Sequence, residues 1–320
     1  MLDLRQIHYF LEIAAEGNMT RAAERLHITQ PALSRQISAL EARLGLTLFD
    51  RSGRGIHLAA QARALLPELR DLMSRAAAIQ ERAVALSGRE RVRLSLIAPP
   101  QSIEVFLADA LAAFMKRYPD ADIKIIEAAA QDNQELLERG EGQMAIAARP
   151  IGPQFQARDL ARGFIHLALP EDHPLARKRH VSVEELDGES VVVMRKGTLA
   201  RDMFDSACRL THTMPNIAHE AGSPHALAAL AAAGIGIAVM PFAARVDPTG
   251  LALVRLHAGG RPLAAELAAV WTPNLYISPA IDALIEEVHH SMKAAPFLEP
   301  VPVRQGERRD ASNRARAPAA

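Results

Sequence analysis

Four residues near the N-terminus carry side chains suited to close contact with a nucleic acid. They are Pro31, Ser34, Arg35 and Ser38, and their spacing places them on one face of a predicted helix. Small hydroxyl groups and one guanidinium let a helix approach base edges and phosphates and still donate hydrogen bonds. None of these four side chains can help to build a hydrophobic core. The spacing therefore favours a helix that enters a groove of double-stranded DNA.

The opposite face of the same helix is apolar and would hold it against the protein. Its members recur at spacings of four, three and four, as on one face of an α-helix: Leu33, Ile37, Leu40 and Leu44. Thr29 is a suitable N-cap, and Gln30 and Pro31 occupy the first turn, where a missing amide proton costs little. Because the N-terminus of a helix carries partial positive charge, this end favours an anion such as a phosphate.

A shorter helix precedes this one in the sequence. Thr20 is a suitable N-cap for it, and Ala22, Ala23 and Leu26 give a face of mostly small side chains on which the next helix can pack closely. Residues 20–44 are therefore predicted to form two helices joined by a tight turn. Amphipathic helix pairs are common, so periodicity alone leaves open whether this pair binds DNA or only builds a core.

A hairpin is predicted after the second helix. The segment LTLFDRSGRGIHLA at 46–59 has the pattern of two short strands around a turn at 52–55. Arg54 lies between two glycines at the tip, from which a guanidinium can enter a narrow minor groove, where negative potential is concentrated. The alternative is an ordinary arginine in a solvated loop.

These motifs resemble a known family of DNA-binding proteins. The run from Phe10 through Arg54, which includes AAERLHITQPALSRQISALEARLGLTLFDRSGR, is similar to the N-terminal winged helix-turn-helix of the LysR-type transcriptional regulators. The rest of the chain, to about Lys293, resembles that family in length and element order and less in its residues. The segment LAAQAR at 58–63 departs from the common pattern, in which a Thr and a Gly follow the wing, and this bears on where the linker helix starts. By the resemblance, Gln30, Pro31, Ser34 and Arg35 face the major groove and Arg54 the minor groove, with Thr20 and Thr29 completing the DNA-binding set.

A long linker helix is predicted over residues 60–88, after a winged helix-turn-helix domain at 1–59. Its apolar residues recur at alternating spacings of four and three, which is a heptad pattern: Leu58, Ala62, Leu65, Leu69, Leu72, Ala76, Ile79, Ala83 and Leu86. A single helix cannot bury such a stripe alone, so it must pair with another helix. We expect Leu65, Leu69 and Leu72 to lie between two copies of the chain, in a homodimer or a homotetramer. The alternative is packing against the C-terminal domain of the same chain.

Short apolar strands alternate with helices from residue 90 onwards, which predicts α/β lobes with parallel sheets. The elements form two similar sets, so two lobes are expected. In LysR-type regulators the effector-binding domain is similar to a two-lobed periplasmic solute-binding protein. The resemblance places this domain at 90–298, with lobe I at 90–165 and 266–295 and lobe II at 166–265. The tail at 299–320 is rich in Pro, Ala and Arg and is expected to be disordered.

The cleft expected between the lobes lies at the carboxyl ends of parallel strands, where helix N-termini can hold small anions. Gln101 and Ser102 follow the first strand of lobe I, and Lys196 and Thr198 repeat the arrangement in lobe II. In LysR-type regulators the corresponding loops line the effector pocket. The resemblance therefore implies that Ser102 and Thr198 bind a small-molecule effector, which we expect to be a carboxylate. His225 is a further candidate, but a solvated loop side chain is the better interpretation of both Lys196 and His225.

The composition limits the possible classes of protein. The 320 residues carry 37 Lys plus Arg and 37 Asp plus Glu, so no overall basic charge points to a nucleic-acid binder, and DNA affinity must come from a local surface. Cys208 is the only cysteine, which excludes a disulfide within the chain and fits a reducing cytoplasm. No apolar run reaches the roughly 18 residues of a membrane-spanning helix, and no signal peptide is predicted.

No group of residues has the spacing of an enzyme or a cofactor site. His219 and His225 are six residues apart, with a Gly and a Pro between them, so one helix cannot present both to a metal. Gly234 and Gly236 lack the third glycine of a dinucleotide-binding loop and precede a strand. Cys208 lies in a predicted helix, where a lone cysteine is more often a core residue than a nucleophile.

We therefore interpret the sequence as a cytoplasmic LysR-type transcriptional regulator, α/β overall, that binds double-stranded operator DNA and a small effector and needs no cofactor. Two alternatives remain open. One is a DNA-binding protein without ligand control, which ligand-dependent operator binding would rule out. The other is a small-molecule-binding or enzymatic protein with an incidental N-terminal helical bundle, which substrate turnover would reveal.

Overall fold

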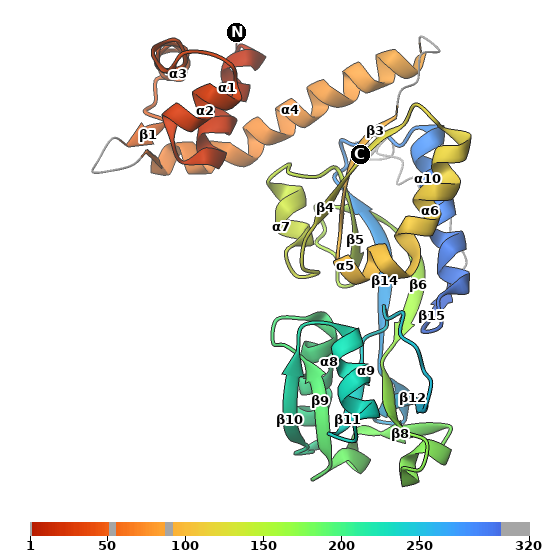
Figure 1. Cartoon of the computed structure of the whole chain (residues 1–320). Coiled ribbons are helices and arrows are strands. Elements are labelled where there is room, and N and C mark those ends of the chain that lie inside the picture. The colour runs from red at the N-terminus through yellow and green to blue at the C-terminus, as the bar shows by residue number, and fades with distance from the viewer. Residues whose placement is uncertain (1, 51–55, 87–91, 302–320) are drawn as a thin grey trace, which may run out of the picture. The chain divides into compact units, whose positions relative to one another are not determined.

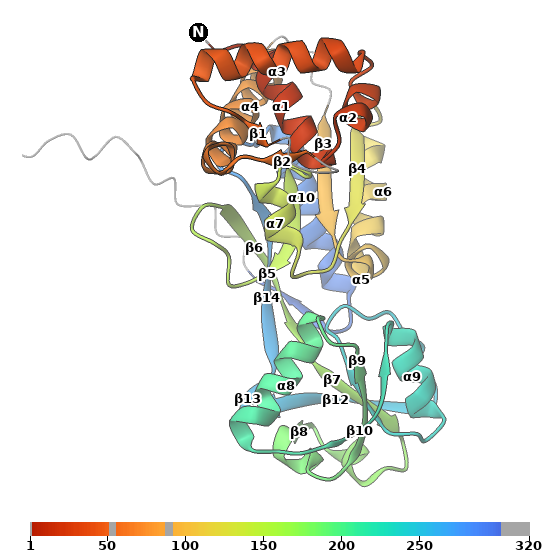
Figure 2. The ribbon, with the colours of Figure 1, turned by 90° about the vertical axis from the view of Figure 1, so that its left-hand side faces the viewer.

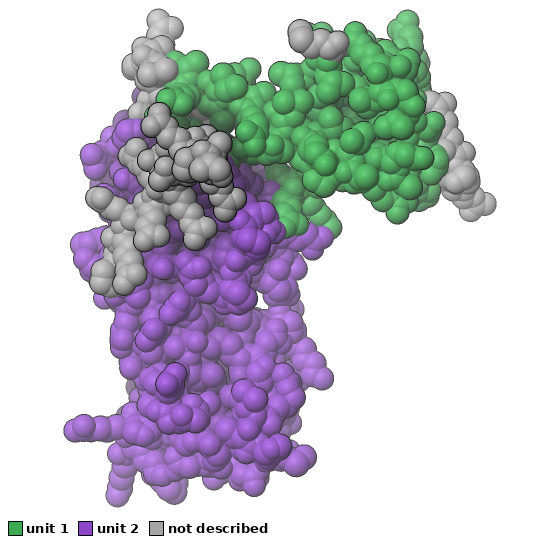
Figure 3. Space-filling model, turned by 180° about the vertical axis from the view of Figure 1, so that it is seen from behind, with its two compact units in different colours: residues 1–90, 138–140, 274–276 green, residues 91–137, 141–273, 277–320 purple. Residues whose placement is uncertain are grey.

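The computed structural model describes residues 2–50, 56–86 and 92–301 and divides the chain into two compact units (Figures 1 and 3). Unit 1 comprises residues 1–90 with two short later segments, and unit 2 comprises the remainder. Within the described ranges, no helix is both long enough and apolar enough to cross a membrane.

Unit 1 is built from helices and a two-stranded hairpin. Its elements are α1 (Leu4–Glu16), α2 (Met19–Arg25), α3 (Gln30–Leu44), β1 (Phe49–Asp50), β2 (His57–Leu58) and α4 (Ala60–Leu86). Strands β1 and β2 pair antiparallel, with Phe49 opposite Leu58. The connection at 51–55 lies outside the described residues.

One hydrophobic core joins the helices of unit 1. Residues that are fully buried in it come from α1, α3 and the position just before β1: Ile7, Phe10, Ile13, Leu33, Leu40 and Leu48. The rings of Phe10 and Phe49 lie 5.4 Å apart, which packs the hairpin against α1. Gly17 ends α1 with a φ of 59°, a left-handed conformation that glycine adopts without a steric penalty. The core therefore fixes α3 by its apolar stripe.

Lobe I of unit 2 has a six-stranded sheet in the order β15-β6-β14-β5-β3-β4. Its strands are β3 (Arg93–Ala98), β4 (Asp122–Glu127), β5 (Met144–Ala148), β6 (Gln156–Phe164), β14 (Ala264–Trp271) and β15 (Leu298–Pro300). Its helices are α5 (Pro100–Ser102), the π-helical segment η1 (Ile103–Leu107), α6 (Ala108–Arg117), α7 (Asn133–Glu138), α10 (Pro279–Ser291) and the 3-10 turn η4 (Met292–Ala294). Helices α6 and α10 pack side by side (Figure 1).

Lobe II has a seven-stranded sheet in the order β10-β9-β11-β7-β12-β13, with β8 paired to β12 (Figure 2). Its strands are β7 (His166–Pro170), β8 (His180–Ser182), β9 (Ser190–Met194), β10 (Asn216–Ala221), β11 (Ile237–Met240), β12 (Leu251–Ala258) and β13 (Arg261–Pro262). Its helices are η2 (Pro174–Arg177), η3 (Val183–Leu186), α8 (Leu199–Thr211) and α9 (Pro224–Ala232).

Both sheets are mixed, which corrects the parallel sheets predicted from strand and helix alternation. Strand β3 is parallel to β4 and β5, and β9 is parallel to β10 and β11. Strand β14 pairs antiparallel with β5 and β6 in lobe I, and β7 pairs antiparallel with β11 and β12 in lobe II, where β12 is also parallel to β8. The reason is that the chain passes between the lobes through β6 to β7 and through β13 to β14, and these connecting strands run against the parallel set.

The C-terminal segment makes a third connection between the lobes. Phe297 is buried in the core of lobe II, and its ring lies 4.3 Å from that of His166. The next residues form β15, which pairs with β6 in lobe I. The prediction that disorder begins at residue 299 is therefore wrong for 299–300, because hydrogen bonds to β6 order this strand. Residues 302–320 lie outside the described part of the chain.

Candidate DNA-binding surface and effector cleft

Helix α3 is capped by the residue that the sequence predicted. Thr29 has an extended backbone, with φ −78° and ψ 144°, and its Oγ1 accepts a hydrogen bond from the amide of Ala32 at 3.4 Å. Gln30 and Pro31 form the first turn and are exposed. Because the cap satisfies one of the amides that a helix N-terminus leaves free, α3 starts at a defined residue with its first turn in solvent.

The outer face of α3 is polar. Arg35 and Ser38 are exposed and Ser34 is half-buried, whereas the apolar stripe on the other face is buried: Leu33, Ile37 and Leu40. Gln36 accepts a hydrogen bond from Nε2 of the buried Gln6 on α1 at 2.9 Å, which links the two helices. The stripe and this bond fix the rotation of α3, so the DNA-contacting side chains predicted on this helix share one solvent-facing surface.

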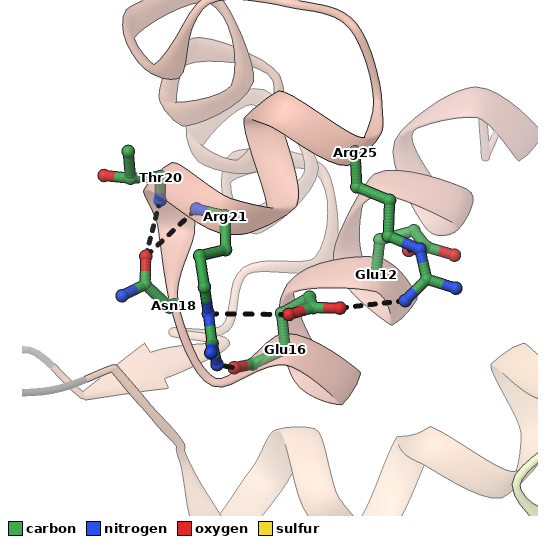
Figure 4. Close-up of polar contacts among 6 residues, drawn as sticks. All are labelled: Glu12, Glu16, Asn18, Thr20, Arg21 and Arg25. Carbon is green, nitrogen blue, oxygen red and sulfur yellow. Dashed lines mark hydrogen bonds and ion pairs between the residues drawn. The ribbon is translucent and has the colours of Figure 1, made fainter.

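Helix α2 is capped by Asn18, and not by Thr20 as the sequence predicted (Figure 4). Asn18 Oδ1 accepts hydrogen bonds from the amides of Thr20 at 2.9 Å and Arg21 at 3.1 Å. An Asn side chain is long enough to satisfy both amides from one position earlier in the chain. Thr20 is thus the second residue of α2, and its side chain is exposed.

Ion pairs at the surface of unit 1 connect α1 with α2. Arg21 donates to the carbonyl oxygen of Glu16 at 2.8 Å, and Arg25 Nη1 contacts Glu16 Oε1 at 2.8 Å (Figure 4). Arg25 Nε also lies 3.4 Å from Glu12 Oε2. Surface pairs of this kind contribute only about 0–1 kcal/mol each, so their role is to orient the side chains.

The hairpin after α3 is anchored by Glu41, whose Oε1 accepts a hydrogen bond from the amide of Leu48 at 2.8 Å. This bond sets where β1 begins. Arg54, the predicted minor-groove residue, lies outside the described residues, so its contact with DNA stays a prediction.

The apolar stripe of α4 divides into two parts. Leu69 is 5% exposed and lies in the core of unit 1, with Leu65 packed against that core. Leu72 and Ile79 are 37% and 69% exposed. The expectation that Leu69 lies between two chains is therefore wrong, because the core of the DNA-binding domain in the same chain buries it. Leu65 is only partly buried, and its place between two chains stays a prediction. The later part of the stripe, at Leu72 and Ile79, is exposed and available to pack against another helix.

The predicted effector residues of lobe I lie at the start of a distorted helix. Gln101 is half-buried and Ser102 is 5% exposed, and both belong to α5. The π-helical segment η1 follows directly, and such segments often occur at functional sites. Ser102 is thus placed at the carboxyl end of β3, as the sequence predicted, but its side chain is almost fully covered.

The corresponding residues of lobe II are more accessible. Lys196 is exposed and Thr198 is half-buried. Thr198 occupies the N-cap position of α8 without capping it, because its Oγ1 donates to the carbonyl oxygen of Arg195 at 3.0 Å. A Cβ at Gly197 would lie 3.6 Å from Nε2 of Gln131 in lobe I, so the two lobes approach each other at this loop.

His225 lies in the first turn of α9 with an exposed side chain, and Ser223 caps that helix through the amide of Ala226 at 3.3 Å. His225 lines neither of the two cavities that lie beside α8. Over residues 2–50, 56–86 and 92–301, no cluster of three His, Cys, Asp or Glu side chains could hold a metal ion.

Comparison with protein families assigns both units. Residues 4–63 match the model for the bacterial regulatory helix-turn-helix protein of the lysR family, and residues 87–293 match the LysR substrate binding domain. The chain belongs to the LysR family of transcriptional regulators. It is therefore a DNA-binding regulator with a substrate-binding domain, and its family is one of regulators and not of enzymes.

Curated LysR-family relatives align over most of the chain. AlsR of Bacillus subtilis (strain 168) is 30% identical over 248 residues, which cover 76% of this chain and 82% of AlsR. HcaR of Escherichia coli (strain K12), the Hca operon transcriptional activator, is 29% identical over 272 residues, covering 84% and 91%. Both are regulators of transcription by their names.

Solved structures confirm the fold class. A full-length OxyR variant from Pseudomonas aeruginosa superposes with a TM-score of 0.72 at 23% identity, covering 90% of this chain and 98% of OxyR. Full-length CbnR in complex with its target DNA gives a TM-score of 0.56 at 24% identity, covering 91% and 100%. The winged helix-turn-helix and the two-lobed α/β domain of this LysR-family chain are those expected from the sequence.

Two cavities beside helix α8 of this LysR-family regulator contain none of the five predicted effector residues. A cavity of about 770 Å³ lies beside the strands that connect the lobes, and its lining includes Arg149, Arg162, Phe164, Met203 and Arg261. None of these residues was predicted from the sequence as a ligand contact. They lie on separate segments of β6, β13, α8 and the loop after β5, and no local spacing signals that such segments meet.

Cys208 lies on the inner face of α8 and is 8% exposed. Burial, with a contribution from Asp205, raises the pKa of its thiol to about 11. The thiol is therefore protonated at neutral pH and is a poor nucleophile, in agreement with the core role expected from the sequence.

Proposed function

We propose that this regulator binds operator DNA through α3 and the hairpin after it, as a homodimer or homotetramer, and that a small anionic effector of the carboxylate class controls this binding. The observation that carries the DNA part is α3, with a capped N-terminus and a polar face over a buried stripe. The side chains proposed to contact DNA are Thr20, Thr29, Gln30, Pro31, Ser34, Arg35 and Arg54. Because such a regulator acts at the chromosome, we also propose a cytoplasmic location.

The oligomer is supported by the exposed second part of the α4 stripe. Ile79 is a large apolar side chain that is 69% exposed, and Leu72 precedes it by two helical turns on the same face. A symmetric helix pair would cover both residues and present two copies of α3 to two half-sites about one DNA turn apart. Ile79→Glu should therefore give a folded monomer with weak operator binding, measured by sedimentation velocity and circular dichroism. An Ile79→Glu protein that stays dimeric would show that the interface lies elsewhere.

Effector control is supported by the two loops that begin α5 and α8. Ser102 and Thr198 lie at helix starts in different lobes, and the lobes come close at Gly197 and Gln131. A ligand that contacts both lobes stabilises one arrangement of them and can shift any equilibrium coupled to it.

The test uses the full-length protein and operator DNA that the protein itself selects from a random oligonucleotide pool. Operator affinity is measured by fluorescence anisotropy with and without each member of a panel of small carboxylates and their amides. We expect at least one carboxylate, and not its amide, to change the affinity by about fivefold or more. Ser102→Ala and Thr198→Ala should reduce this response and leave the ligand-free affinity unchanged. A panel without any effect contradicts ligand control.

A further inference from the structure

Two cavities adjoin along helix α8 and form one continuous groove. The first has a volume of about 770 Å³ and the second about 580 Å³, and they share the lining residues Leu199, Met203 and Ala264. Both values lie within the range of about 300–1,000 Å³ that is usual for small-molecule sites. We call this continuous space the α8 groove; it runs between α8 and the segment around β13, which lie side by side in Figure 2.

One end of the α8 groove carries a single uncommitted cation. Arg149 is held by Asp159, with its Nε 2.9 Å from Oδ1, and Arg162 is held by Glu266 at 3.3 Å. Arg261 has no such partner: among the residues that the structure describes, no carboxylate or carbonyl oxygen accepts a hydrogen bond from its guanidinium. Because two of the three guanidinium groups are neutralised locally, this end offers one net positive charge to a ligand.

The other end of the α8 groove is apolar and open. Its lining includes Ala207, Leu210, Ala258 and Leu263, and Leu210 is 83% exposed. A large apolar side chain that is so exposed gains free energy when another apolar group covers it. Leu210 lies eleven residues after Leu199 on α8, which at 1.5 Å per residue is roughly 16 Å along the helix. The apolar part of the groove therefore extends along α8.

We propose that the α8 groove binds a linear alkyl monocarboxylate of roughly eight to twelve carbons, whose extended chain fits within the roughly 16 Å between Leu199 and Leu210. The carboxylate pairs with Arg261, whose planar guanidinium can donate two parallel hydrogen bonds to it. The alkyl chain passes Met203 and ends against Leu210. A dianion such as a phosphate ester would leave one charge unpaired, and a sugar would find few polar partners along the apolar wall.

The α8 groove also offers a route to regulation, in a part that rests on the proposed function. Arg149, Arg162 and Glu266 belong to lobe I, whereas Leu199, Met203 and Arg261 belong to lobe II. A ligand in the groove therefore contacts both lobes and favours one arrangement of them over another. Ser102 and Thr198 do not line the groove, although Leu199, which does, directly follows Thr198. The groove and the proposed effector site at Ser102 and Thr198 can therefore be altered by separate substitutions.

Calorimetric titration of the full-length protein with butanoate, hexanoate, octanoate and decanoate, all below their micellar concentrations, tests the binding site. We expect affinity to rise by up to about fourfold for each added methylene, which is the effect of burying it. Octanamide should bind at least about tenfold more weakly than octanoate. Arg261→Gln should weaken octanoate to the level of octanamide, whereas the matched control Arg179→Gln, at another exposed position of lobe II, should leave it unchanged.

Leu210→Glu tests the tail end of the groove. It should abolish the gain from octanoate to decanoate and leave hexanoate unchanged, whereas Met214→Glu, also at a highly exposed position, should change neither. If all variants show the same dependence of affinity on chain length, the ligands partition nonspecifically onto apolar surface and the proposal is overturned. The proposal is also overturned if Arg261→Gln leaves the affinity for octanoate unchanged. If octanoate binds in the groove but leaves operator affinity unchanged, the site stands and only its regulatory role is lost. If another carboxylate acts through Ser102 and Thr198 while octanoate does not bind, the groove is wrong and the proposed function stands.

Discussion

Helices α3 and α8 both start at a threonine and both bury one apolar stripe, but they offer different surfaces to their surroundings. Thr29 caps α3 with its own hydroxyl, whereas the hydroxyl of Thr198 turns back to the carbonyl oxygen of Arg195. The outer face of α3 is polar, and that of α8 ends in the exposed Leu210. The inner stripe thus fixes a helix in the fold, while the cap and the outer face decide what the helix can bind.

The largest effect on stability should come from truncating side chains in the buried apolar stripes of α3 and α8. Leu33 and Phe204 are buried at 0% and 1% exposure, so Leu33→Ala should lower the unfolding free energy of the DNA-binding domain by about 2–5 kcal/mol and Phe204→Ala that of the effector domain by about 3–5 kcal/mol. Urea denaturation, followed by circular dichroism, measures both. Leu210→Ala on the outer face of α8 is the control and should stay within about 0.5 kcal/mol of the wild type. Equal losses at Leu210 and Phe204 would mean that the two faces of α8 have been assigned wrongly.

The second-largest effect should be on DNA affinity, from substitutions on the outer face of α3. Arg35→Ala should weaken binding to the selected operator by about 1–3 kcal/mol and binding to random DNA by much less, because a side chain aimed at base edges discriminates between sequences. Ser34→Ala should act in the same direction. Arg209→Ala, an exposed arginine on α8, is the matched control and should change neither affinity. Anisotropy titrations at one salt concentration make the comparison. If Arg35→Ala weakens binding to the operator and to random DNA equally, Arg35 contacts a phosphate and not a base.

A smaller effect separates the two threonines. Thr29→Ala removes a cap and should destabilise the DNA-binding domain by about 0.5–2 kcal/mol. Thr198→Ala removes no cap, so the effector domain should lose less than about 0.5 kcal/mol. Thermal unfolding of both variants, with Thr29→Ser as the conservative control, tests the difference. A larger loss at Thr198 than at Thr29 would contradict the hydrogen bonds described for these two hydroxyls.

The smallest effect on function is expected at Cys208. Its thiol pKa is raised from 9.0 to about 11, so the thiolate fraction near pH 8 should be about a hundredfold lower than for an unperturbed cysteine. Alkylation by iodoacetamide should be correspondingly slow in the native protein, should speed up as the pH rises towards 11, and should become fast in urea. Operator binding should be insensitive to mild peroxide and to Cys208→Ser. Rapid alkylation of the native protein at pH 8 would show that the Cys208 thiol is exposed to solvent and that its place on the inner face of α8 is wrong.

The features predicted best from the sequence are those, such as helix ends, that depend on neighbouring residues. Thr29, two residues before a proline, marks the start of α3 by a rule that needs only neighbouring residues, and the structure has this start where the rule places it. The error at Thr20 is of the same local kind, since Asn18 is an equally good cap and only its geometry decides.

What the sequence could not predict depends on distant partners. The heptad pattern of α4 correctly indicated a packed stripe, but periodicity cannot distinguish a second chain from the domain that buries Leu69. The pairing of β6 with β14 could not be predicted, because β14 lies more than a hundred residues later in the chain, with Arg162 opposite Glu266. The cavity around Arg261 went unnoticed for the same reason, because its walls come from segments that meet only after both lobes have folded.

The order of strands in lobe I has a consequence for synthesis on the ribosome. Lobe II is one continuous stretch of chain from β7 to β13, so it can complete its sheet as soon as β13 has emerged. Lobe I cannot, because β14 lies between β5 and β6 in its sheet and β15 is added after that. Although it begins first, lobe I is finished last, and until β14 arrives both β5 and β6 expose an unpaired edge. A nascent chain that is stopped before β14 would thus carry a complete lobe II sheet, which still lacks Phe297 in its core, next to a half-built lobe I sheet. Unpaired strand edges of this kind bind chaperones and promote aggregation.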